Sequence, residues 1–302
     1  MKYIILLVTF LSTAMPSMAQ SASDLAAHTS KLKNATQRAL DQEILPRFKS
    51  ALKDDYPTLV DDVKVEVVKF ADFNALADYE KHKIIIPLGL IVGQDLILNA
   101  VQTTMQYPQK ASRFEPYINY LADRYQQAAE KGRDDLPVQD FAAFAHIPRS
   151  EYEKIYLSEE FQAIREKALV DSLALIVAHE FGHHAKHHKP TAKVTPAISR
   201  SQEEEADLFA LNLCTKAKFP VLPGISSTFT LFCAFDSGGG KATHPPTPCR
   251  ILAIGEAATR EMKKDPGAME GLAKVGMKWE DMERGFVELR KLCDAAKTQS
   301  EQ

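Results

Sequence analysis

The sequence predicts an α+β fold that is mainly helical with a small sheet. Most apolar residues recur at helical spacing, in segments that end at proline, glycine or polar breaks. Only two short runs rich in valine and isoleucine, 63–68 and 83–86, have the pattern of strands. The chain has 302 residues, of which 45% are hydrophobic, and this is enough to bury the core of one domain.

The first nineteen residues have the pattern of a signal peptide. Lys2 precedes an apolar run, and Ser17-Met-Ala19 is a small-x-small cleavage site, so the mature chain should begin near Gln20. The apolar stretch is shorter than the roughly twenty residues of a spanning helix. We therefore expect a periplasmic or secreted protein, with one domain over 20–302 and no stable membrane insertion after cleavage. The 37 basic and 40 acidic residues give no basic surplus that would indicate nucleic acid.

The N-terminal part predicts a scaffold helix followed by the sheet. Residues 23–52 are amphipathic, with a bend expected at Pro46. The strand at 83–86 runs into Pro87, which should end an edge strand because a missing amide costs little there. A helix is expected from about Leu90 to Met105.

Residues 106–167 contain several aromatic-rich helical candidates. These are 114–129, 141–147 and 159–167, with a polar break at 130–135. We expect this stretch to be a packed helical segment, with a substrate-selecting lid as the alternative. A third alternative makes His146 an inhibitory fourth metal ligand.

The next helix carries the most informative motif, His179-Glu-Phe-Gly-His183. We expect it to open at a cap on Asp171 and to stop before Pro190. A helix advances about 100° per residue, so His179 and His183 lie roughly 40° apart on one face. Two imidazoles can thus share one zinc ion, and Glu180 is placed to take a proton.

A second helix, residues 199–214, supplies carboxylates. Glu203 and Asp207 lie four apart on a face that continues into apolar residues. Burying carboxylates is costly unless they are paired or coordinate a metal. Catalytic zinc takes three protein ligands and keeps a fourth position for water, so Glu203 completes a site for one Zn²⁺ per chain.

The spacing excludes one competing zinc signature. The metzincin pattern requires a glycine and a third histidine at the positions of Lys186 and Lys189. The chain instead resembles the HtpX-like and CAAX prenyl protease family of gluzincin metallopeptidases. The motifs that carry this resemblance follow in the family's order, and they are Asn74–Ala77, Ile84–Leu90, His179–His183, Ser199–Asp207 and Thr243–Arg250.

The resemblance implies a zincin-like fold and a role for each matching residue. The zinc ligands would be His179, His183 and Glu203, and Glu180 would be the general base. Outside this set, His244 would stabilise the oxyanion, Asp207 would hold a ligand histidine, and Arg250 would order the site through a carboxylate. In members of the family, the zinc helix follows almost directly after the Gly-Leu turn, which corresponds to Gly89-Leu90 here. Residues 106–167 would therefore be an insertion.

Three more histidines follow the motif, at 184, 187 and 188. A second metal site is one interpretation. We prefer a simpler one, in which the helix is ending and at least two of the three face water.

The four cysteines suit an oxidising compartment. They allow three connectivities, of which we favour Cys233 with Cys249, because this bond would fix the loop of His244. Cys214 and Cys293 would then pair, or remain buried free thiols.

Together these features predict a zinc-dependent metalloendopeptidase that cleaves unfolded or loop segments of envelope or secreted proteins. An edge strand beside the zinc would bind an extended peptide by strand addition. The main alternative is a chaperone-like binding protein with an envelope partner and a latent or structural zinc site. A third interpretation is an exopeptidase, although no charge clamp for a peptide terminus is evident.

Overall fold

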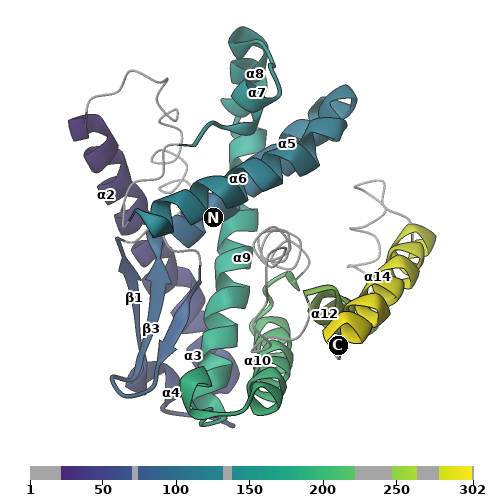
Figure 1. Cartoon of the computed structure of the whole chain (residues 1–302). Coiled ribbons are helices and arrows are strands. Elements are labelled where there is room, and N and C mark those ends of the chain that lie inside the picture. The colour runs from purple at the N-terminus through teal and green to yellow at the C-terminus, as the bar shows by residue number, and fades with distance from the viewer. Residues whose placement is uncertain (1–21, 70–73, 132–137, 222–246, 264–278, 301–302) are drawn as a thin grey trace.

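The computed structural model describes residues 22–69, 74–131, 138–221, 247–263 and 279–300 (Figure 1). These residues form a mainly helical structure with one three-stranded sheet, which agrees with the predicted α+β class. No helix within them is both long enough and apolar enough to cross a membrane. The predicted signal peptide, Cys233 and His244 lie outside the described residues.

The N-terminal helix is interrupted just before Pro46, where the sequence predicts a bend. Helix α2 (Ala22–Ala39) passes through a π-helical turn, η1 (Leu40–Ile44), into α3 (Leu45–Leu52). Pro46 stands in the first turn of α3, where its missing amide hydrogen costs little. The short helix α4 (Leu59–Asp62) then leads to the sheet.

The sheet has the order β1-β3-β2. Strand β1 (Lys64–Val68) is parallel to β3 (Lys83–Pro87), and β2 (Leu76–Asp78) is antiparallel to β3. The prediction that Pro87 ends an edge strand is wrong, because β3 is central. The proline is tolerated because it is the last strand residue and directly precedes helix α5.

The two edges of the sheet have different neighbours. The amide of Gln37, on α2, covers the outer edge of β1: it donates to the Val65 carbonyl at 3.3 Å and accepts from the Val67 amide at 3.1 Å. Strand β2 forms the other edge and packs against helix α9. With three residues, β2 is too short to show a pattern in the sequence.

The segment expected to be an insertion forms helices. Helix α5 (Leu88–Gln106) leads through η2 (Pro108–Arg113) to α6 (Phe114–Glu130), α7 (Phe141–Phe144) and α8 (Arg149–Tyr156). The α6 residue Tyr125 donates to the Gly89 carbonyl of α5, and Tyr117 donates to the Gln139 carbonyl at 3.0 Å. The first of these contacts packs α6 against α5. Helices α7 and α8 lie at the top of Figure 1, at the N-terminal end of α9.

Helix α9 (Glu159–Ala185) is one continuous helix. Its cap is Ser158, whose side chain accepts from the Phe161 amide at 3.3 Å. The expected cap at Asp171 is wrong, because this residue is buried in the middle of the helix and pairs with Lys167 at 2.8 Å. No helix breaker separates the two predicted pieces, so 159–167 forms the first turns of the site helix.

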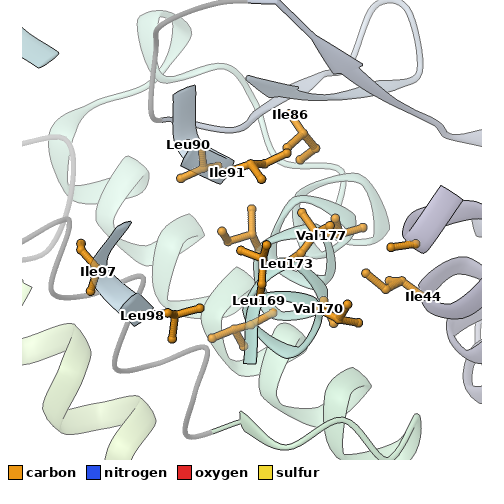
Figure 2. Close-up of a cluster of buried hydrophobic side chains, with 14 of the residues drawn as sticks. Ile44, Ile86, Leu90, Ile91, Ile97, Leu98, Leu169, Val170, Leu173 and Val177 are labelled. Atoms are coloured by element: carbon orange, nitrogen blue, oxygen red, sulfur yellow. The ribbon is translucent and has the colours of Figure 1, made fainter. Parts of the chain in front are cut away.

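The remaining described helices are η3 (Thr191–Lys193), α10 (Pro196–Lys216), α12 (Thr247–Met262) and α14 (Trp279–Ser300). Helix α9 lies between the sheet and α10 (Figure 1). Apolar side chains of η1, β3 and α5 surround its central turns, including Ile44, Ile86 and Ile91 (Figure 2). The core therefore holds α9 from several directions.

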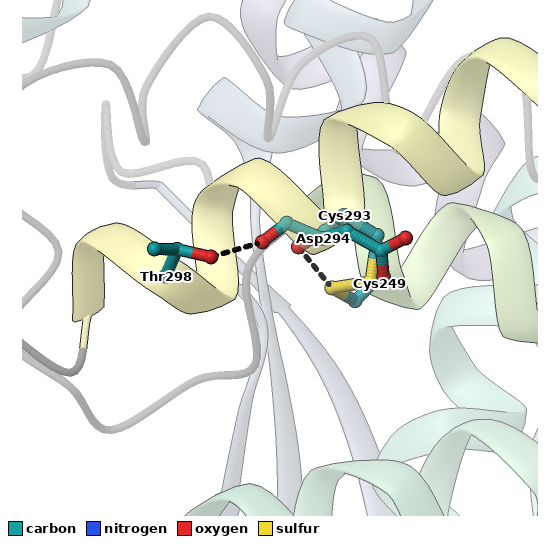
Figure 3. The surroundings of a disulfide bond; sticks show 4 residues. All are labelled: Cys249, Cys293, Asp294 and Thr298. Atoms are coloured by element: carbon teal, nitrogen blue, oxygen red, sulfur yellow. Dashed lines mark hydrogen bonds between the residues drawn. A yellow bond between two sulfur atoms is a disulfide. The ribbon is translucent and has the colours of Figure 1, made fainter.

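One disulfide joins the last two helices. Cys249 of α12 bonds to Cys293 of α14 (Figure 3), so the predicted Cys233–Cys249 pairing is wrong. Cys214 is a buried free thiol, which was the alternative left open for it. Spacing alone could not select this pairing, because it depends on how α14 packs against α12. The disulfide anchors α12 next to Arg250.

Candidate metal centre

The candidate metal centre lies where α9 and α10 approach closely. A Cβ atom at Gly182 would lie 3.0 Å from the Cα of Ala206 and 3.2 Å from the Cβ of Phe209. Glycine at 182 and alanine at 206 therefore let the two backbones come together. This approach brings Glu203 of α10 beside the two histidines of the α9 motif.

Three ligand atoms converge at this point. The Nε2 atoms of His179 and His183 are 3.1 Å apart. Of the two Glu203 carboxylate oxygens, Oε2 lies 3.4 Å from Nε2 of His179 and Oε1 lies 3.6 Å from Nε2 of His183. Tetrahedral zinc with bonds of roughly 2.0–2.1 Å holds neighbouring ligand atoms about 3.3 Å apart. Within the described part of the chain, these three residues form the one group of His, Cys, Asp or Glu side chains whose ligand atoms lie close enough together to hold a metal ion. The donor set fits a zinc ion.

The other ring nitrogen of His179 is held by a buried ion pair. Nδ1 of His179 lies 2.9 Å from Oδ1 of Asp207. Arg250 of α12 donates to both oxygens of Asp207, at 2.8 Å each, and its NH2 group lies 3.5 Å from Glu203. The structure thus places Asp207 against a ring nitrogen of His179 and Arg250 against the Asp207 carboxylate.

The other ring nitrogen of His183 contacts a histidine that the sequence argument left aside. Nδ1 of His183 lies 2.9 Å from Nδ1 of His188, and Nε2 of His188 lies 3.3 Å from Oε2 of Glu205. Both ligand histidines therefore present Nε2 to the same point, while Nδ1 is occupied elsewhere. The signal that was missed is the five-residue spacing from His183 across the helix end.

The protonation of the centre reflects its crowded charges. Burial disfavours the charged form of His179, but hydrogen bonds to Asp207 and Glu203 outweigh it and raise its pKa to about 10. Burial opposes the ionised form of Glu203, but His179 and Arg250 hold its pKa well below the ordinary value. Without a metal, a proton on His179 thus balances the carboxylates. A bound cation would replace that proton.

Glu180 lies at the side of the centre that faces the sheet. It is buried, and burial raises its pKa to about 7, while a hydrogen bond from the Ala77 amide of β2 opposes the rise. A carboxylate with a pKa near neutrality can accept and return a proton. Tyr79, which follows β2, also faces the centre: its ring is 6.4 Å from that of His183, and burial and the charges of Glu180 and Glu203 raise its pKa. Sequence reasoning did not single out Tyr79.

The expectation that two of the three following histidines face water is wrong. Only His187 is exposed; His184 and His188 are 7% and 8% exposed. The Nε2 atom of His184 lies 3.2 Å from the Lys83 carbonyl, which ties α9 to β3. The proposal of His146 as a fourth ligand is also wrong, because it is exposed between α7 and α8, at the other end of α9.

Comparisons with known proteins give one match. No curated protein and no solved structure matches the chain. The model of a peptidase family, Peptidase U49, matches residues 88–265, which are more than half of the chain and include α9, α10 and α12. The match supports a peptidase, whereas the resemblance to HtpX-like and CAAX prenyl proteases depends on the sequence motifs alone. The chain belongs to the Peptidase U49 family, and we conclude that it is a peptidase.

Proposed function

We propose that this peptidase is a zinc-dependent endopeptidase with one Zn²⁺ per chain, held by His179, His183 and Glu203. The observation that carries the proposal is the convergence of three potential ligand groups, whose ligand atoms, one per residue, all lie within 4.8 Å of one another, with the buried carboxylate of Glu180 beside them. When bound, zinc supplies a Lewis acid that activates water and polarises the scissile carbonyl. The site then has the parts that amide hydrolysis requires.

Glu180 is the general base in this proposal. Its carboxylate takes a proton from the attacking water and returns it to the leaving amine nitrogen. The Ala77 amide donates to this carboxylate and orients it. Its pKa of about 7 suits both steps, because neither form of the group is strongly favoured near neutral pH.

The edge strand β2 supports an extended substrate. Its Ala77 amide points to Glu180, so the outer edge of β2 runs beside the proposed base. A peptide that adds to this edge would place a main-chain carbonyl near the ligand triangle with little demand on its side chains. We infer that the substrates are unfolded or loop segments of proteins.

The remaining assignments form part of the same proposal. Asp207 and Arg250 hold His179 through the ion pair described above. His244 would donate to the oxyanion, as the resemblance to gluzincins implies. We propose that the protein works in the periplasm or outside the cell, because of its predicted signal peptide.

The chaperone-like alternative is less well supported. A structural or latent zinc site does not need a buried carboxylate of raised pKa next to the metal. An exopeptidase would need a group that binds a peptide terminus, and the sequence indicates none.

The test is mass spectrometry of products after the purified chain is incubated with unfolded proteins. We expect internal cleavage that a chelator abolishes and added zinc restores. Removal of terminal residues alone would indicate an exopeptidase. Suppressed aggregation of the clients without any new termini would favour the chaperone-like alternative.

A further inference from the structure

We infer that His188 is a positioning residue, which sets the tautomer and ring orientation of the ligand His183 through a relay to Glu205. The inference rests on the proposed zinc site and adds the contacts that orient its second histidine, His183. Neither His188 nor Glu205 is among the residues that the sequence predicts for this site.

The backbone at the end of α9 places the two rings together. His187 has a φ of 52°, its amide bonds to the His184 carbonyl at 3.2 Å, and the His188 amide bonds to the His183 carbonyl at 3.1 Å. This is the Schellman arrangement, in which the residue after the left-handed position contacts the third-from-last helical residue, here His183. That contact is usually apolar. Here it brings imidazole against imidazole, with centroids 5.1 Å apart.

A reciprocal clamp fixes this turn on α10. The side-chain amide of Gln202 accepts from the Lys189 backbone amide at 3.0 Å and donates to the Lys189 carbonyl at 2.8 Å. The helix that carries Glu203 therefore also holds the residue next to His188. As a result, the His188 ring has a defined position relative to the ligand triangle.

The hydrogen-bond chain allows only one order of protons when His183 is neutral and bound to metal. Glu205 is a carboxylate and only accepts, so Nε2 of His188 must carry its proton. Nδ1 of the neutral His188 is then bare and accepts from Nδ1–H of His183. This leaves Nε2 of His183 with its lone pair toward Glu203 and His179, which is the form that binds zinc.

Burial predicts which member of the relay matters more. The His188 side chain is 5% exposed, whereas that of Glu205 is 56% exposed. Water can replace the Glu205 carboxylate as an acceptor. It cannot easily reach Nδ1 of His183. Loss of His188 should therefore be costly, and loss of Glu205 should be mild.

The test compares zinc affinity, measured by chelator competition, in four variants. His188→Leu keeps an apolar contact but removes the acceptor, and should lose about 10- to 100-fold in affinity, as such partners of metal ligands do. His188→Asn places an amide oxygen near the position of Nδ1 and should recover most of this loss. Glu205→Gln should lose less than about 10-fold. The control is His187→Asn, which suits the left-handed backbone and should bind like the parent chain.

A second measurement is independent of any variant. Long-range ¹⁵N–¹H correlation spectra of the zinc-loaded parent chain should show His188 neutral and protonated at Nε2, and His183 protonated at Nδ1. A His188 protonated at Nδ1 would overturn the relay. So would equal affinities of parent and His188→Leu, or equal losses in the Leu and Asn variants. If the parent chain takes up no zinc, the proposed function itself fails, and the relay fails with it.

Discussion

Two buried polar clusters lie along helix α9, and they differ in how their charged side chains are paired. In its C-terminal half, His179 and His183 form the candidate metal centre with Glu203 of α10, and Arg250 of α12 pairs there with Asp207 of α10. In its N-terminal half, Arg165 pairs with Asp95 of α5 at 3.0 Å, and Glu166 lies beside them. Neither carboxylate oxygen of Glu166 has a hydrogen-bond partner among the described residues.

The difference appears in the pKa of the carboxyl groups. Burial raises the pKa of Glu166 to about 7, against the attraction of Arg165, so this acid is largely neutral in mildly acidic solution. Asp207, buried to a similar degree, has a lowered pKa because Arg250 and His179 outweigh its burial. Charge persists in the interior where it is fully paired. The C-terminal cluster is therefore the one in which a metal can replace a proton.

The largest expected effect separates the ligands from their neighbours. His179→Ala, His183→Ala and Glu203→Ala should each abolish zinc binding, because each removes one of three ligand atoms. Glu204→Ala, at an exposed position next to Glu203, is the matched control and should bind zinc normally. Metal analysis after gel filtration measures the zinc bound per chain. A fully loaded Glu203→Ala chain would contradict the ligand assignment.

The ion pairs of the two clusters should respond differently to the same change. Asp207→Ala and Asp95→Ala each remove the partner of a buried arginine, and each should lower the free energy of unfolding by about 3–5 kcal/mol. Only Asp207→Ala should also weaken zinc binding, by about 10- to 100-fold. Urea denaturation and chelator competition measure the two effects. Equal zinc affinities in the two variants would make Asp207 a purely structural residue.

The close approach of α9 and α10 can be tested at Gly182. Its Cβ position meets backbone and Cβ atoms at 3.0–3.2 Å, so Gly182→Ala should force the helices apart and cost about 1–3 kcal/mol of stability. It should also weaken zinc binding, because Glu203 moves with α10. Gly285, whose Cβ would meet nothing within 4 Å, provides the control. A Gly285→Ala variant should bind zinc like the parent chain and should be no less stable, because alanine at an exposed helical position stabilises by up to about 1 kcal/mol relative to glycine.

The smallest expected effect concerns the unpaired acid. The folded-state pKa of Glu166, about 7, lies above its ordinary value of 4.5. Its contribution to stability is thus full below pH 4.5 and is lost as the pH rises to 7, on the order of 1–2 kcal/mol. Glu166→Gln imitates the neutral acid and should reduce this decline. Urea denaturation at pH 5 and pH 8 measures the free energy of unfolding of both chains. If this free energy falls equally between the two pH values in the variant and the parent chain, Glu166 does not titrate in this range.

The sequence was sufficient to predict which polar side chains the structure brings together at the candidate centre, because helix geometry alone relates His179 to His183 and Glu203 to Asp207. It also predicted the helical character of the chain and two of the three strands. Asp171 was mistaken for a cap because caps and buried i,i+4 partners use the same residue type. The order of the sheet, and hence the central position of β3, depends on long-range pairing that a short apolar run does not reveal.

Other contacts between distant segments could not be predicted. The pairing of Cys249 with Cys293 depends on the packing of α14 on α12. The buried cluster of Asp95, Arg165 and Glu166 cannot be recognised in the sequence, because it forms only when α5 packs against α9. His188 looked like a surface histidine because the helix ends there. The left-handed backbone of His187 turns it back onto His183 instead.

The most direct test of the proposed zinc peptidase is the Glu180→Gln variant. The amide has nearly the same shape as the carboxylate and leaves the ligand triangle intact, but it cannot accept a proton from water. We predict that this variant binds one zinc per chain, unfolds like the parent chain, and produces no internal cleavage of unfolded proteins by mass spectrometry. Cleavage at the parental rate by the zinc-loaded variant would contradict the proposed mechanism.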